Sequence, residues 1–233
     1  MNSIVSRYEH KFYIDKITFS SLQKMLSDLL QTDKNCIDNQ SYLVTSLYYD
    51  SLNNSAYYDK IDGVEFRKKI RIRSYDNSDR LKFEIKEKHG DIIVKTSKVF
   101  SKKDFSDINT FLKLPNQNNQ KKVSSIIDQN IYKKLAYTYR KPVVWVEYDR
   151  LAYTLPFNNV RITFDMNLRS KEVCGDVIGY DPPKMESVSD FSDIILEIKY
   201  NNYLPKHVAR IFGAYSLNKS AISKYCNSRK VIY

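Results

Sequence analysis

Hydrophobic and polar residues alternate along several segments of this chain. In KKIRIRSY, residues 68–75, Lys69, Arg71 and Arg73 share one parity, while Ile70 and Ile72 share the other. Because a β-strand sends alternate side chains to opposite faces, this pattern predicts a strand with one apolar face and one cationic face. Similar segments rich in Ile, Val, Tyr, Phe and Thr predict about eight strands, over residues 3–14, 41–49, 64–75, 80–88, 91–100, 142–153, 159–168 and 193–200.

Apolar residues at helical spacing lie between these segments. In residues 18–30 the apolar positions are Leu22, Met25, Leu26, Leu29 and Leu30. They predict a helix, with Ser20 or Thr18 as its N-cap. Further helices are expected over residues 101–114, 123–137, 205–215 and 220–226. The polar stretch PNQNNQKK, residues 115–122, is expected to be a loop between two helices.

Charged residues repeat on one parity of most predicted strands. These sets are Arg7, Glu9 and Lys11; Lys82, Glu84, Lys86 and Lys88; Arg161, Thr163 and Asp165; and Glu197 and Lys199. Adjacent strands of this kind can close into a barrel whose apolar side is covered by helices and whose charged side lines a lumen. We therefore expect an α+β fold, an antiparallel β-barrel forming a tunnel with helices packed outside, as a single domain over residues 1–233. Crowded cations in such a lumen require a highly charged anionic ligand.

The overall charge agrees with an anionic ligand. The chain has 38 Lys and Arg against 27 Asp and Glu, a net charge of +11, which favours a polyanion or an anionic membrane surface as partner. The cysteines, Cys36, Cys174 and Cys226, form no CxxC pair, which argues against a zinc ribbon or a disulfide framework and favours a reducing, cytoplasmic location. No apolar run approaches the ~20 residues of a transmembrane helix, so we expect no transmembrane segment.

An ordered set of short motifs resembles the VTC domain. In chain order they are HKFYI, LYYDS, KIRIRSY, FEIKEK, VEYDR, VRITFD, LEIKY and SKY, and they span nearly the whole chain. The resemblance is to a polyphosphate polymerase domain of the triphosphate tunnel metalloenzyme (CYTH-like) superfamily. It implies a tunnel that binds ATP or another nucleoside triphosphate and, with Mn²⁺ or Mg²⁺, transfers the terminal phosphate to polyphosphate or pyrophosphate. It also leaves open a membrane partner protein.

The resemblance assigns roles to particular residues of this chain. The catalytic and substrate-binding contacts to phosphate fall on Lys11, Arg71, Arg73, Lys86, Lys95, Arg150, Arg161, Lys199 and Lys224. Spacing alone leaves Lys98 open as an alternative to Lys95. Glu197 is the preferred metal ligand and Glu9 the second, because a carboxylate between basic neighbours suits a hard cation that bridges phosphate oxygens. Such residues suit phosphoryl transfer, which needs positioning and charge neutralisation more than a nucleophilic side chain.

Several alternatives stay open at this point. The hydrolytic branch of the superfamily usually begins with two alternate glutamates, and Arg7 stands at the first of these positions, which favours the polymerase branch. A triphosphate hydrolase or cyclase, and a non-catalytic polyanion-binding domain, are the competing hypotheses. No nucleic acid partner is expected, because the parity opposite the cations of KIRIRSY carries isoleucines. For Glu84 and Glu147 we expect structural salt bridges, and for His10 a place in the core or wall.

Overall fold

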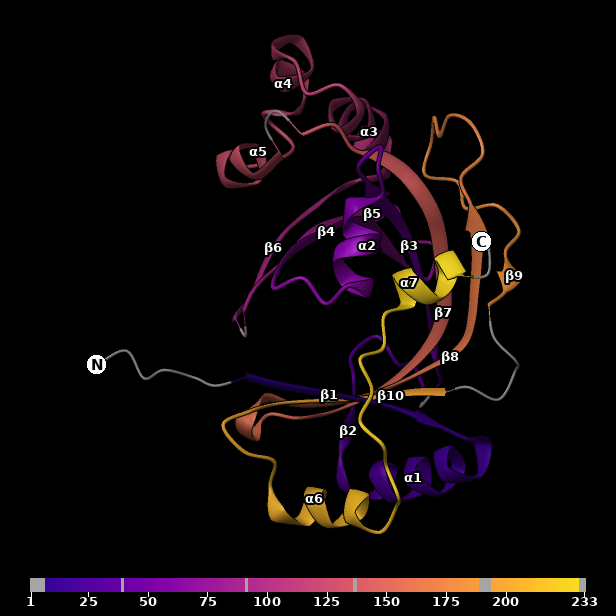
Figure 1. The fold of residues 1–233 in the computed structure, drawn as a ribbon. Coiled ribbons are helices and arrows are strands. Elements are labelled where there is room, and N and C mark those ends of the chain that lie inside the picture. Colours follow the sequence, from indigo (N-terminus) through magenta and orange to yellow (C-terminus); the bar gives the residue numbers. More distant parts are fainter. Residues whose placement is uncertain (1–6, 39, 91, 136–137, 189–193, 231–233) are drawn as a thin grey trace. The chain divides into compact units, whose positions relative to one another are not determined.

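The computed structural model describes residues 7–38, 40–90, 92–135, 138–188 and 194–230. Its chain divides into two compact units (Figure 1). Unit 1 comprises Met1–Leu43, Tyr148–Leu168 and Ser187–Ser223, and unit 2 comprises Val44–Glu147, Arg169–Glu186 and Lys224–Tyr233. The long strands β7 (Lys141–Leu155) and β8 (Val160–Glu172) contribute residues to both units.

The remaining elements belong mainly to one unit each. Unit 1 holds β1 (Arg7–Ile14), α1 (Lys16–Leu29), β2 (Gln31–Thr32), the 3-10 turn η2 (Phe157–Asn159), β10 (Ile194–Asn201) and α6 (Lys206–Gly213). Unit 2 holds β3 (Tyr42–Asp50), α2 (Ser55–Ile61), β4 (Phe66–Tyr75), β5 (Arg80–His89), β6 (Ile92–Ser101), η1 (Lys102–Asp104), α3 (Phe105–Lys113), α4 (Gln117–Val123), α5 (Gln129–Leu135) and α7 (Lys224–Lys230). The short strand β9 (Glu186–Ser187) pairs with β8.

The strands form one hydrogen-bonded sheet with the path β1-β10-β8-β7-β3-β4-β5-β6. Pairing is antiparallel between β1 and β10, β10 and β8, β3 and β4, β4 and β5, and β5 and β6. The predicted α+β class, with an antiparallel sheet whose main path has eight strands, is therefore confirmed. The prediction of one enclosed lumen concerns both units together and stays a prediction.

In unit 2, the apolar parity of β3, β4 and β5 packs into a core. Ile72 and Phe83 lie opposite each other in register and are fully buried. Phe105 and Phe111 of α3 belong to the same buried cluster, as does Trp145 of β7. The face of these strands that packs against the helices is therefore buried, and the opposite parity carries the charged residues.

In unit 1, α1 supplies Leu22 and Leu26 to the core. Phe19 of α1 meets Phe164 of β8 edge to face, with ring centroids 5.0 Å apart. Phe164 also contacts Tyr153 of β7 at 6.4 Å. The apolar parity predicted for residues 159–168 therefore faces the core of this unit.

Some local predictions were wrong. Helix α1 is capped by Asp15, whose carboxylate accepts a hydrogen bond from the backbone of Thr18 at 2.7 Å, so neither Ser20 nor Thr18 is the N-cap. The expected loop at 115–122 contains α4, because Asn116 caps a helix and Val123 is buried at its end. Met25 and Leu29 are exposed.

Besides α4, the described residues contain elements that were not expected from the sequence. They are α2, the short strands β2 and β9 and the 3-10 turn η2. Parts of four predicted elements, residues 3–6, 91, 136–137 and 193, lie outside the described residues. Within the part of the chain that the structure describes, none of the helices is long and apolar enough to cross a membrane.

Candidate functional site

The charged face of unit 2 is built by register across β4, β5 and β6. Arg71 lies opposite Glu84, and Arg73 lies opposite Lys82. Lys86 is paired with Lys69 on one side and with Lys95 on the other. Antiparallel pairing in register keeps these side chains on the same face, as their common parity predicted.

Four cations converge on the carboxylate of Glu84. Nε of Arg71 donates to Oε2 at 2.7 Å and Nη2 lies 2.6 Å from the same atom, while Nζ of Lys95 lies 2.5 Å from Oε1. Lys82 and Arg73 are farther away, at 3.7 and 3.9 Å. We call these five residues the Glu84 cluster. The predicted ion pairing of Glu84 is confirmed, and Glu147 likewise pairs with Arg169 at 2.9 Å.

The electrostatics of the Glu84 cluster reflect a crowding of positive charge. Glu84 is only 2% exposed. Burial alone would raise the pKa of Glu84, but the charges of Arg71, Arg73 and Lys95 outweigh burial and hold that pKa well below its usual range. Burial lowers the pKa of Lys95, and the neighbouring charges of Lys82 and Arg71 act in the same direction while Glu84 opposes them. Burial is thus the main cause of the lowered pKa of Lys95, and the neighbouring cations add to it.

The register also distinguishes Lys95 from Lys98. Lys95 lies opposite Lys86 on the charged parity of β5. Lys98 lies opposite Phe83, on the parity that faces the core side of the sheet. Lys95 is therefore the residue that shares a face with Arg71, whereas its contact with phosphate stays a prediction. Lys224 is the first residue of α7.

Sequence reasoning did not single out Tyr48 and Ser46 of β3. The hydroxyl of Tyr48 accepts a hydrogen bond from Nη1 of Arg71 at 2.9 Å, and Ser46 accepts one from Nε of Arg73 at 3.1 Å. Both residues lie directly opposite their arginine in the β3–β4 register. The signal that could have found them is parity combined with strand pairing, because neither residue is charged.

In unit 1, two lysines and two glutamates alternate across β1 and β10. Lys11 lies opposite Glu197, and Glu9 lies opposite Lys199. Nζ of Lys11 is 3.0 Å from Glu9 and 3.5 Å from Glu197. Lys199 forms an ion pair with Glu197 and lies 4.0 Å from Glu9. Burial alone would lower the pKa of Lys11, but Glu197 and Glu9 raise it above its usual range, so Lys11 stays charged.

The other predicted cations of unit 1 have acidic partners within the unit. Arg150 binds Asp165 through two hydrogen bonds of 2.6 and 2.7 Å, and both residues are buried. Arg161 donates to Asp33 at 3.1 and 2.9 Å and to the hydroxyl of Tyr42 at 3.1 Å. Their predicted contacts with phosphate stay predictions.

His10 lies on the opposite parity from Glu9 and Lys11. Its ring stacks on Tyr200 with centroids 5.7 Å apart, and its Nε2 is 3.1 Å from the Tyr200 hydroxyl. Burial and the charge of Lys219 lower the pKa of His10. The predicted wall position of His10 agrees with these contacts.

The carboxylates Glu9 and Glu197 fit a hard divalent cation by their chemistry. Both lie within 3.5 Å of the same Lys11 nitrogen, so their oxygens are close together. Among the residues that the structure describes, no three His, Cys, Asp or Glu side chains are grouped to hold a metal ion by themselves. A pair of carboxylates suits Mg²⁺ or Mn²⁺ when phosphate oxygens and water complete the coordination.

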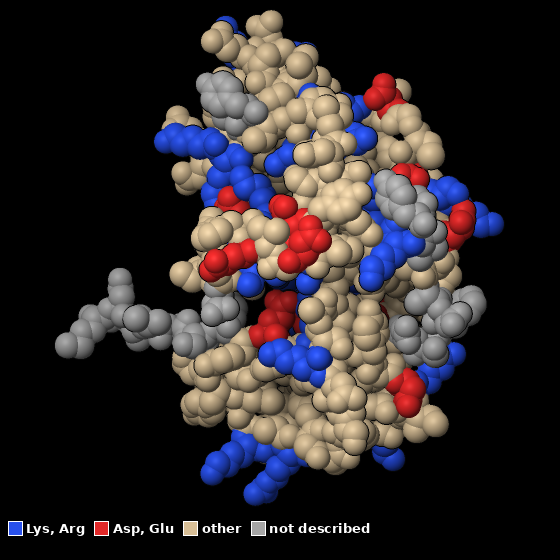
Figure 2. All heavy atoms as spheres, viewed as in Figure 1, with Lys and Arg blue, Asp and Glu red and all other residues tan. Residues whose placement is uncertain are grey.

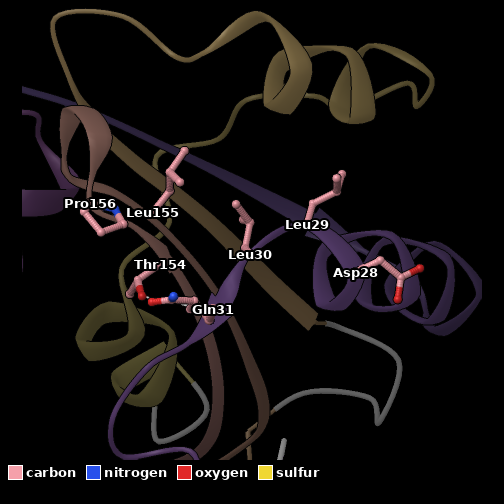
Figure 3. Close-up of a pocket in the computed structure, with 7 residues that line it drawn as sticks. All are labelled: Asp28, Leu29, Leu30, Gln31, Thr154, Leu155 and Pro156. Carbon is pink, nitrogen blue, oxygen red and sulfur yellow. Dashed lines mark hydrogen bonds between the residues drawn. The ribbon is translucent and has the colours of Figure 1, made fainter.

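A separate pocket lies in unit 1 where α1 and β2 approach the end of β7 (Figure 3). It is lined by Asp28, Leu29, Leu30, Gln31, Thr154, Leu155 and Pro156. Its only charged lining residue, Asp28, is acidic, which disfavours anions. Figure 2 shows basic side chains distributed over the visible face and interrupted by small acidic groups, in keeping with the net charge of +11.

Comparison with known families identifies the chain. The VTC domain model matches residues 6–233, and the chain belongs to this family, as its motifs indicated. None of the curated proteins matches the sequence.

Solved structures are similar to this chain at low sequence identity. One is a protein from Hippeastrum described as an adenylyl cyclase candidate with a dominant triphosphatase activity. It is 12% identical, with a TM-score of 0.51 over 97% of this chain and 96% of that chain. Another, from Vibrio parahaemolyticus and described as an adenylate cyclase candidate, is 10% identical with a TM-score of 0.48 over 97% of each chain. The Hippeastrum structure supports the fold and no more.

Proposed function

We propose that this VTC domain is a phosphotransferase of the polyphosphate polymerase type. It moves the terminal phosphate of ATP, or of another nucleoside triphosphate, onto a polyphosphate or pyrophosphate acceptor. Phosphoryl transfer places negative charge on the moving group, and cations fixed around it stabilise that charge. In this proposed mechanism the basic residues bind and orient the phosphates, and no side chain acts as a nucleophile.

The observation that supports the proposal best is the Glu84 cluster. One carboxylate carries one negative charge and cannot neutralise Arg71, Arg73, Lys82 and Lys95 together. Like charges held this close are costly unless an anion compensates them. A chain of phosphates supplies several negative charges at close spacing. The guanidinium groups are suited to grip phosphate oxygens bidentately, and the lysine can follow a moving anion as a point charge.

The glutamates of unit 1 are the proposed metal ligands. Glu197 and Glu9 would hold Mn²⁺ or Mg²⁺ with help from phosphate oxygens and water. The bound ion would supply charge neutralisation at the transferring phosphate. Lys11 and Lys199 form ion pairs with both carboxylates, so each carboxylate already faces a cation that a metal ion could replace.

Hydrolysis or cyclisation of a triphosphate is the second candidate. The similar fold of the Hippeastrum protein, described as having a dominant triphosphatase activity, favours it. Arg7 at the position of the first glutamate favours the polymerase instead, since it removes one carboxylate from the metal site. A third reading is a domain that binds polyphosphate without catalysis. A cytoplasmic location, the absence of a nucleic acid partner and a membrane partner protein stay predictions.

One product assay separates these functions. The purified protein is incubated with ATP, Mn²⁺ and a pyrophosphate primer, and the products are resolved on a gel that separates polyphosphate from free phosphate. Polymer supports the proposal. Free phosphate without polymer, or cyclic AMP, would contradict it in favour of the second candidate. The doubly substituted Arg71→Ala, Arg73→Ala protein is the control, since it should yield no product while remaining folded.

A further inference from the structure

Tyr48 holds Arg71 in two ways. The two residues are directly opposed in the β3–β4 register. The Tyr48 hydroxyl accepts a hydrogen bond from Nη1 of Arg71 at 2.9 Å, and the guanidinium carbon lies 5.7 Å from the centre of the Tyr48 ring. Both the polar end and the aromatic face of Tyr48 therefore contact the same cation.

Tyr48 is held in place by Tyr225, which is itself hydrogen-bonded to the buried carboxylate of Asp50. The Tyr48 ring stacks on Tyr225 of α7, with centroids 5.1 Å apart and planes inclined by 26°. The Tyr225 hydroxyl donates a hydrogen bond to Asp50, which is 1% exposed. Asp50 also accepts from the backbone nitrogens of Ala56 and Tyr57 at the start of α2, at 2.9 and 3.1 Å. The contacts that position Tyr48 therefore lead through Tyr225 to a carboxylate that the backbone of α2 holds in place.

These contacts matter because an arginine side chain has many conformations. Glu84 engages Arg71 through Nε and Nη2, at 2.7 and 2.6 Å, and Tyr48 engages Nη1. A guanidinium held from two sides loses less freedom when it binds an anion, so its contact is stronger than that of an unsupported arginine.

We propose that Tyr48 is a positioning residue for Arg71, which fixes the guanidinium for binding to a phosphate chain. The inference rests on the proposed function, because it adds a residue to the same anion site. Tyr48 acts through Arg71 and is itself only 5% exposed.

A pH dependence follows from this geometry. The charged and titratable groups facing Tyr48 are Lys69, Arg71 and Arg73 of β4 and Tyr225 of α7, with Glu84 of β5 beyond Arg71. Burial alone would raise the pKa of Tyr48, but Arg71 and Arg73 outweigh burial and lower that pKa to about 8. Above this pH a phenolate competes with phosphate for Arg71. Since a bound anion disfavours the phenolate, affinity for an anion should fall as pH rises through the pKa of Tyr48.

The test compares two tyrosine hydroxyls on neighbouring positions. Tyr48→Phe removes the hydrogen bond from Arg71 to the hydroxyl and keeps the ring. Tyr49→Phe is the matched control, since Tyr49 donates to Asn109 at 2.8 Å on the core side of the same strand. Calorimetric titration with tripolyphosphate at pH 7 should show about tenfold weaker binding for Tyr48→Phe and binding within about twofold of wild type for Tyr49→Phe. Thermal melts establish that both variants are folded.

A double-mutant cycle distinguishes positioning from a general structural effect. In an Arg71→Ala background, Tyr48→Phe should cause no further loss of tripolyphosphate affinity. Between pH 7 and 9, the affinity of the wild type for tripolyphosphate should fall more steeply than the affinity of Tyr48→Phe. The comparison with Tyr48→Phe also controls for the titration of tripolyphosphate itself. Equal affinities of Tyr48→Phe and wild type, or an undiminished effect of Tyr48→Phe without Arg71, would overturn the inference alone. Failure of the wild-type protein to bind tripolyphosphate would overturn the proposed function and the inference together.

Discussion

Glu84 is shared by four cations, so its neutralisation should cost stability in the free protein. We expect Glu84→Gln to be less stable than wild type at pH 7, because Arg71, Arg73, Lys82 and Lys95 would then repel one another without the charge of Glu84 between them. Glutamine keeps the size of the side chain. The change therefore tests charge rather than packing.

The magnitude follows from burial and geometry. Removing one partner of a fully buried ion pair costs roughly 3–5 kcal/mol. Glu84 is 2% exposed, but the side chain of Lys95 is 47% exposed, so water screens part of the repulsion. We therefore expect a loss of about 2–3 kcal/mol in the free energy of unfolding. For a chain of this size, that corresponds to a fall of roughly 4–12 °C in Tm.

Urea unfolding with and without tripolyphosphate provides the measurement. Tripolyphosphate should stabilise Glu84→Gln more than wild type, since the ligand supplies the missing negative charge. Glu147→Gln is the matched control, because Glu147 pairs with the single cation Arg169 and is partly exposed, so its loss should cost about 1 kcal/mol or less. Equal stability of Glu84→Gln and wild type would refute the reasoning.

At acidic pH, the difference in stability between Glu84→Gln and wild type should disappear. A carboxyl whose pKa in the folded protein lies below its ordinary value of 4.5 contributes stability that is present above that value. This contribution is lost as pH falls through the folded pKa. The stability gap between Glu84→Gln and wild type should therefore be full at pH 7 and narrow progressively below pH 4.5.

Further predictions concern the binding of phosphate and metal. Combined Arg71→Ala and Arg73→Ala should weaken tripolyphosphate binding at least about a hundredfold in calorimetry, since each charge-assisted contact is worth about 1.5–3 kcal/mol. Retained tight binding would exclude both residues from the phosphate site. Lys95→Ala should weaken binding about tenfold or more, whereas Lys98→Ala, on the opposite parity, should leave affinity unchanged; equal losses would contradict the register argument. Glu197→Gln should retain tripolyphosphate binding and lose Mn²⁺-dependent turnover, and unchanged turnover would place the metal elsewhere.

Much of the fold could be predicted because alternation encodes both strand and face. KIRIRSY carries its cations on one parity, and β4 shows the same division between charged face and core. The helices were harder. The sequence NQNNQKKV has little apolar periodicity, and α4 forms there because Asn116 caps it and Val123 is buried. Asp15, three residues before the expected N-cap Thr18, shows how a cap depends on where the preceding strand ends.

The candidate site was predictable only in part, for a physical reason. Parity selects charged residues within a strand, but pairing between strands decides which residues meet. Lys95 and Lys98 look equivalent in sequence, and only the β5–β6 register separates them. Tyr48 carries no charge at neutral pH in isolation, so its link to Arg71 becomes visible only through the β3–β4 register.

The two units differ in how their charges are balanced. In unit 1 the positive charges of Lys11 and Lys199 are matched by Glu9 and Glu197, which suits carboxylates that exchange a lysine partner for a metal ion. In unit 2 the cations exceed the one carboxylate of the Glu84 cluster, which suits an anion.

Because of this difference, mutagenesis can separate metal binding from phosphate binding in the proposed reaction. Substitutions of the glutamates in unit 1 should change the dependence of turnover on metal concentration at nearly constant phosphate affinity. Substitutions in the Glu84 cluster should change phosphate affinity and its salt dependence, because they alter the number of fixed cations that an anion meets. If both sets of substitutions changed the same parameter, the assignment of metal to the balanced carboxylates and of phosphate to the cation-rich cluster would be wrong.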